Sequence, residues 1–263
     1  MKNNVIPIDI IGPEKWKALE ILNPNAFPSG LKPGALACAD QLALISYSTR
    51  MIRKAVDEDL KKLIKELNHN AAFKDFIPDP QKPALVICRH IDFQAGVQSF
   101  FITTKSVLDI YARMISKAIV PKSDLFSFGK APFKGKKITV GTLLNFLEKS
   151  VPRSYSDRGK LVEILVSHIN DWISDAVEAR DAIVHDGVLK NIIEMHVPML
   201  KKPQEITADD IILPSIQGKG SILGYCQGIR QNIDRMLKET LVLLPGVDTK
   251  LICPIGRAGG DRW

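Results

Sequence analysis

The chain has 263 residues, 45% of them hydrophobic and 25% charged, and its 36 Lys and Arg residues against 29 Asp and Glu give a formal net charge of +7. These proportions exclude a low-complexity or fibrous chain, and the basic excess favours an anionic partner such as nucleic acid. No run approaches the ~18 apolar residues of a membrane span and no signal-peptide pattern opens the chain, so we expect a cytoplasmic protein with no membrane partner. The four cysteines form no C-x-x-C pair, so we expect neither a disulfide framework nor a zinc site.

The N-terminal third is predicted to hold two helices. A short helix covers 13–20, with Pro13 in its first turn, and a long amphipathic helix covers about 35–68. A proline-rich connection at 69–91 follows, and its apolar run at 84–88 fits either a strand or a helix. We treat 1–91 as an N-terminal extension that adds an extra long helix.

Residues 92–263 are predicted to form a helical domain, with helices at about 92–118, 140–149, 157–186 and 221–244. Residues 193–199 alternate apolar and polar side chains, which indicates a strand, and 211–213 is its predicted partner. A further strand is predicted at 248–255. The expected fold class is therefore mainly α: an up-and-down helical bundle with a small β-hairpin insertion near 192–215.

The most informative segment is 180–187, at the C-terminal end of the predicted helix 157–186. Asp181 and His185 are four residues apart, so on a helix they share a face, and the carboxylate would fix the imidazole tautomer. Arg180 adds a permanent cation whose forked donors match a phosphate. The alternative is an ion pair at a helix end with no functional consequence. Arg180 also continues a ladder of residues four apart at the edge of the apolar stripe: His168, Trp172, Ala176 and Arg180.

The segment Arg-Asp-Ala-Ile-Val-His at 180–185 resembles the R-x4–6-H signature of the HEPN superfamily, whose members are all-helical and often ribonucleases. The polar residue that commonly follows the arginine in that family is Asp181 here, and the resemblance extends over about 92–245. It implies RNA as the substrate, a homodimer in which two motifs meet, no metal or other cofactor, and a role in stress or defence. Gly187 stands where some toxin members carry a tyrosine that a partner modifies, so no such neutralising partner is implied.

On this interpretation His185 would take the proton of the 2′-hydroxyl or protonate the leaving 5′-oxygen. Arg180 would stabilise the charge on the pentavalent phosphorus, and Asp181 would orient the imidazole. The expected products are a 2′,3′-cyclic phosphate and a 5′-hydroxyl.

A second candidate site lies in the segment 122–137, where aromatic residues alternate with lysines. Aromatic rings can stack on bases while lysines neutralise phosphates; the alternative is a surface loop anchored by buried phenylalanines. The segment precedes the motif helix, and the motif lies at the far end of that helix, ~45 Å away for ~30 residues. We therefore expect the two sites to be apart unless the chain doubles back or a second subunit supplies the loop. The nucleic-acid-binding candidates are Lys130, Lys134, Lys136, Lys137, Phe128 and Phe133.

Two other functions fit the same residues. The first is a catalytically silent HEPN-like module that dimerises and binds RNA or protein. The second is a metal phosphohydrolase of the HD type, because His185 and Asp186 form a His-Asp doublet. That family needs further ligands, for which the chain offers an upstream His168 or His90 and a downstream Asp209 or Asp234.

Overall fold

The computed structural model describes residues 13–69, 76–79, 81–82, 84–89, 91–123, 125, 127–138, 140–152, 154–183, 194–212, 215–216 and 220–252. The described part is mainly helical, as the sequence predicts. His185, Asp186 and Gly187 lie outside the described residues, and so do His90 and the last three residues of the strand predicted at 248–255.

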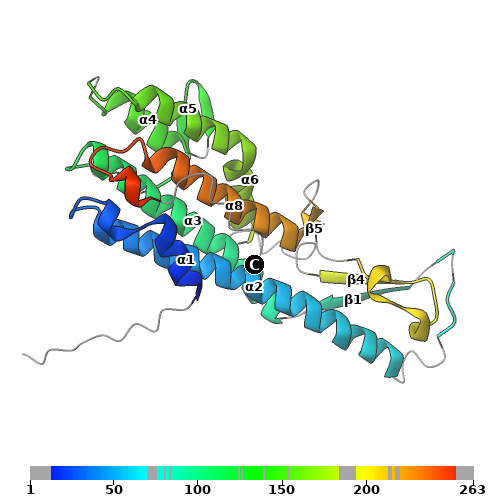
Figure 1. The fold of residues 1–263 in the computed structure, drawn as a ribbon. Coiled ribbons are helices and arrows are strands. Elements are labelled where there is room, and N and C mark those ends of the chain that lie inside the picture. Colours follow the sequence, from blue (N-terminus) through cyan, green and yellow to red (C-terminus); the bar gives the residue numbers. More distant parts are fainter. Residues whose placement is uncertain are drawn as a thin grey trace, which may run out of the picture.

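Four long helical segments lie side by side, and successive ones run in opposite directions (Figure 1). They are α2 (Lys32–His69), α3 (Ile91–Ile119), the run from α5 to α6, and α8 (Ile222–Leu241). The third segment is not one regular helix. It consists of α5 (Arg158–His168), a π-helical turn η3 (Ile169–Ile173) and α6 (Ser174–Asp181), and the N–H of Ser174 donates to the carbonyl of Ile169 across the wider turn.

Shorter elements surround these helices. Helix α1 (Pro13–Ile21) packs on α2, and α4 (Gly141–Lys149) precedes α5. Single turns of 3₁₀-helix occur at η1 (Pro24–Ala26), η5 (Pro203–Glu205), η6 (Ala208–Asp210) and η7 (Thr249–Leu251). The last turn corrects the strand predicted at 248–255 in its described part, because the Asp248 side chain accepts a hydrogen bond from the N–H of Lys250 and closes a turn.

The strand predicted at 193–199 is present, but its main partner is not the one expected. Strand β4 (Glu194–Met199) pairs antiparallel with β1 (Ala84–Arg89) over six residues, from Ala84 opposite Met199 to Arg89 opposite Glu194. The predicted partner region contributes one bridge, in which His196 and Ile212 exchange backbone hydrogen bonds of 3.0 and 2.8 Å. The run at 84–88 offers a longer pairing edge, whereas two 3₁₀ turns interrupt 203–210. Two small hairpins complete the strands: β2 (Ala131–Phe133) with β3 (Lys136–Ile138), and β5 (Ser215–Ile216) with β6 (Gly220–Ser221).

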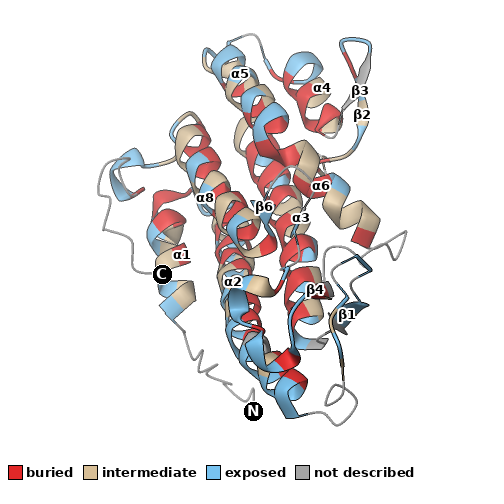
Figure 2. Ribbon diagram, turned by 90° about the vertical axis from the view of Figure 1, so that its right-hand side faces the viewer, coloured by how far each residue is buried: buried red, intermediate tan, exposed pale blue. Residues whose placement is uncertain are grey.

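One hydrophobic core joins the helices. The apolar stripes of α2 and α3 face each other, and Leu42, Ile45, Phe101 and Leu108 are fully buried. The predicted boundary at residue 91 therefore falls between elements that share this core. Figure 2 shows buried residues along the inward faces of the helices, while the C-terminal end of α2 is largely exposed.

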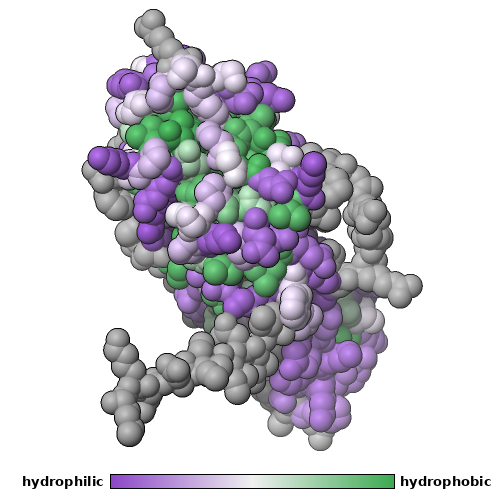
Figure 3. Space-filling view, turned by 60° about the vertical axis from the view of Figure 1, so that its left-hand side comes forward, coloured by the Kyte–Doolittle hydropathy of each residue, from purple (hydrophilic) through white to green (hydrophobic). Residues whose placement is uncertain are grey.

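The surface of the bundle is mixed. On the face that Figure 3 shows, hydrophilic and hydrophobic side chains alternate in small areas, and the lower right of the view is largely hydrophilic. Within the described ranges, no helix combines the length and the apolar character that crossing a membrane requires.

Candidate functional site

The motif begins where α6 ends. Asp181 is the last residue of α6, and the Nη1 of Arg180 donates a hydrogen bond of 3.0 Å to Asp181 Oδ1. A cation in the last turn is favoured by the helix dipole. The ladder predicted from the sequence is confirmed: His168, Trp172 and Ala176 are buried, and the side chain of Arg180, 28% exposed, lies at the edge of the stripe.

Arg180 keeps one donor unused. Its Nε is buried and has no hydrogen-bond partner in the part of the chain that the structure describes. A buried donor without an acceptor costs about 1–3 kcal/mol. The side chain as a whole is 28% exposed, so the guanidinium can still meet a phosphate oxygen at the edge of the stripe.

The second half of the basic segment folds as the β2–β3 hairpin, and Lys130 directly precedes β2. Its two-residue turn is Lys134-Gly135, and both residues have positive φ, 47° and 80°, as a type I′ turn requires. Gly135 adopts this conformation without the steric penalty that a Cβ brings. Lys136 and Lys137 lie on β3, opposite Phe133 and Pro132, and Lys134 is 3.6 Å from Glu148 on α4.

The hairpin lies against the motif, contrary to the separation expected from helix length. The Nζ of Lys130 donates to Asp181 Oδ2 at 2.9 Å, within one chain. The chain doubles back after α3: the N–H of Phe128 donates to the carboxylate of Asp109 on α3 at 2.8 Å, and the Phe128 ring packs on Tyr111. The carboxylate of Asp109 therefore holds the loop along α3 and carries it towards the end of α6.

The two phenylalanines of the candidate site belong to the core. Phe128 is 1% exposed and Phe133 is 7% exposed, so neither presents a free ring face for stacking on a base. Their apolar rings fix the hairpin to the bundle, and Lys134 lies over the Phe133 ring at 5.3 Å from its centroid. We therefore assign them to anchoring and keep the lysines as the candidate RNA contacts.

Asp181 is shared by two cations. Partial burial raises the pKa of its carboxyl, but the hydrogen bonds and charges of Lys130 and Arg180 outweigh this effect and hold the pKa below its ordinary value. The carboxylate is therefore ionised at neutral pH, with one oxygen accepting from each cation. The expected hydrogen bond from Asp181 to His185 involves a residue outside the described ranges.

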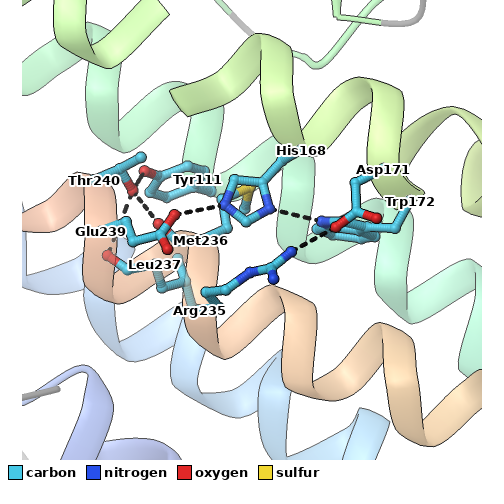
Figure 4. A network of polar contacts seen from close by, with 9 residues as sticks. All are labelled: Tyr111, His168, Asp171, Trp172, Arg235, Met236, Leu237, Glu239 and Thr240. Carbon is cyan, nitrogen blue, oxygen red and sulfur yellow. Dashed lines mark hydrogen bonds and ion pairs between the residues drawn. The ribbon is translucent and has the colours of Figure 1, made fainter. Parts of the chain in front are cut away.

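A separate set of polar contacts joins α3, α5, η3 and α8, and extends from the interior to the exposed pair of Arg235 and Asp171 (Figure 4). The indole N–H of Trp172 donates to His168 Nδ1, which leaves His168 Nε2 to donate to Glu239, both at 2.9 Å. Tyr111 and Thr240 form a neighbouring hydrogen bond, and Arg235 pairs with Asp171 at 2.5 Å. These partners give His168 a structural role that its sequence did not reveal.

Two residues that could serve as metal ligands in an HD-type phosphohydrolase already have other partners. His168 is engaged by Trp172 and Glu239, and Asp234 pairs with Arg230. Among the described residues, no group of three or more His, Cys, Asp or Glu side chains is arranged to hold a metal ion. Burial raises the pKa of Cys38 to about 12 and that of Cys226 still higher, so both remain thiols and neither is an activated nucleophile.

Comparison with known proteins gave no match to a family model, a curated protein or a solved structure. The resemblance to the HEPN superfamily therefore rests on the motif residues.

Proposed function

We propose that the chain is a metal-independent endoribonuclease of the HEPN type, a cytoplasmic homodimer whose helical bundle has the arrangement of that superfamily. The observation that carries the proposal is the cluster of Arg180, Asp181 and Lys130. It brings together two segments 51 residues apart, at the point where the chain continues towards His185. Two cations with one carboxylate between them form a site that a phosphate can enter by displacing the carboxylate.

In the proposed reaction the 2′-oxygen of RNA attacks the adjacent phosphorus while the bond from phosphorus to the 5′-oxygen breaks. The 2′-hydroxyl loses its proton, the leaving oxygen gains one, and His185 serves one or both transfers. Arg180, whose side chain is partly exposed, stabilises the extra charge on the phosphoryl oxygens with its guanidinium. Lys130 holds an adjacent phosphate, and the lysines of the hairpin extend the binding surface.

The test is cleavage of end-labelled RNA by the full chain, with analysis of the product ends. We expect His185→Ala to lower the rate by ~10²–10⁴-fold, and Arg180→Ala to have a similar effect. The double variant should be little worse than either single one, because the residues act as a unit. Arg158→Ala, at the start of α5, is the matched control and should cleave normally.

EDTA separates this proposal from the metal-dependent alternative. The wild type should be insensitive to EDTA and should leave 2′,3′-cyclic phosphates. A phosphohydrolase activity that EDTA removes and zinc or manganese restores would replace this proposal with the HD type. Light scattering should give the mass of two chains, and a monomer across micromolar concentrations would contradict the dimeric site.

The silent binding module is a second candidate, favoured by one observation. Arg180 is already paired with Asp181, and Asp181 with Lys130, as in a helix-capping ion cluster. For that function we expect RNA binding without cleavage, together with a lower melting temperature for His185→Ala.

A further inference from the structure

A polar groove of about 510 Å³ lies on another part of the molecule, between α1, α2 and α8. These three helices lie side by side (Figure 1). Neither Arg180 nor Lys130 lines the groove, so it is distinct from the proposed RNA site. Its volume is within the range of pockets that hold small ligands, roughly 300–1,000 Å³.

Arg230 of α8 forms part of the groove wall and is itself only 9% exposed. Its Nε donates to the hydroxyl of Ser46 at 3.1 Å, and its Nη1 donates to Asp234. Burial lowers the pKa of Arg230 to about 10, which still leaves the guanidinium charged at neutral pH. Asp234 balances this charge at short range, so Arg230 contributes a guanidinium held in a fixed position to the groove wall.

The lining as a whole carries an excess of positive charge. Four basic and two acidic side chains line the groove, so its net charge is positive by two units. The ion pair with Glu14 holds Arg50 at the rim of the groove. Two amides, Gln227 and Gln231, can each donate and accept hydrogen bonds to an uncharged part of a ligand. The basic residues are Lys17, Arg50, Arg53 and Arg230.

We propose that this groove binds a small phosphate-bearing ligand of about the size of a mononucleotide. The arginines supply forked donors that match phosphate oxygens, and the amides and the hydroxyl of Thr49 line the space where a sugar or base would lie. The ligand would compete with Glu14 for Arg50.

Isothermal titration calorimetry on the full chain tests the site with three probes: adenosine monophosphate, pyrophosphate and adenosine. We expect adenosine monophosphate to bind with an affinity that falls as salt rises, and adenosine to bind much more weakly. Arg53→Gln should weaken the nucleotide by roughly tenfold, since it removes a charge-assisted contact. Glu14→Gln should strengthen binding because it releases Arg50. Arg158→Gln, outside the groove, is the matched control and should bind like the wild type.

The two groove variants are expected to change the affinity in opposite directions. Because an unfolded variant could only lose binding, a stronger affinity of Glu14→Gln cannot come from unfolding. Absence of binding by both phosphate probes at millimolar concentration would overturn the proposal. So would binding of the nucleotide that Arg53→Gln and Glu14→Gln alter no more than Arg158→Gln does. Binding of pyrophosphate alone, with the same response to the variants, would support the phosphate site and overturn the nucleotide as its occupant.

Discussion

Replacing Asp181 by asparagine should separate RNA binding from RNA cleavage. In the free protein the Asp181 carboxylate lies 2.9 Å from Lys130 and 3.0 Å from Arg180, so it occupies both cations that a phosphate would use. Asparagine keeps the shape and removes the charge. We expect tighter binding of single-stranded RNA, and slower cleavage if Asp181 also orients His185.

The size of the effect follows from the exposure of the pairs. The side chains of Lys130, Asp181 and Arg180 are 44%, 32% and 28% exposed, so solvent screens both ion pairs. Such pairs are worth about 0.2–1 kcal/mol each, and releasing two cations should tighten binding by roughly 2–30-fold. Two additional phosphate contacts would steepen the dependence of log affinity on log salt by up to ~1.4.

The assay is fluorescence anisotropy of labelled RNA over a series of salt concentrations, with His185→Ala in every protein so that the probe stays intact. The pKa of Asp181 lies below its ordinary value, so the carboxylate is charged at the assay pH. Its two pairs would be lost only as the pH falls through that lowered pKa. Asp171→Asn is the control, because it frees Arg235 away from the hairpin. Unchanged affinity and an unchanged salt slope for Asp181→Asn would refute the assignment of this cluster to phosphate.

Three further variants probe the hairpin and the core. Gly141→Ala should lower the melting temperature and weaken RNA binding, since a Cβ at Gly141 would lie 2.0 Å from the carbonyl oxygen of Ala131 on β2; normal melting would contradict this close contact. Trp172→Phe should lower the free energy of unfolding by about 1–3 kcal/mol, because it leaves His168 Nδ1 without a donor. This corresponds to a fall in melting temperature of several degrees, and a calorimetric shift within error would count against that hydrogen bond. The third variant replaces four lysines of the basic segment by alanine: Lys130, Lys134, Lys136 and Lys137. It should weaken RNA binding and flatten its salt slope by up to ~0.7 per lost contact, whereas an unchanged slope would leave these lysines without a role in binding.

The long helices were predictable because their apolar residues recur with the helical period and face one core. Leu42 and Ile45 of α2, for example, are both fully buried. The pairing of β1 with β4 was not predictable in the same way. The run 84–88 is too short for its periodicity to distinguish strand from helix, and no local signal connects it with a partner more than a hundred residues later.

The candidate site also has one part that the sequence predicts and another that depends on tertiary contacts. The place of Arg180 at the edge of a buried stripe follows from the spacing of four residues along the helix, and the structure confirms it. The approach of Lys130 does not follow from the sequence, because it depends on the contact of Asp109 with the backbone of Phe128. The burial of Phe133 also depends on the tertiary path of the hairpin.

Because of the π-helical turn at η3, the effect of deleting one residue from the run α5–η3–α6 depends on where the deletion falls. A π-helical turn holds one residue more than the α-helical turn it replaces. A chain that lost one residue within Ile169–Ile173 could therefore continue as regular α-helix and still present Arg180 and Asp181 to Lys130. The same loss within α6 would rotate the motif by about 100° around the helix axis and turn it away from the hairpin. We therefore expect the loss of one residue to disturb the site less within the turn than immediately after it.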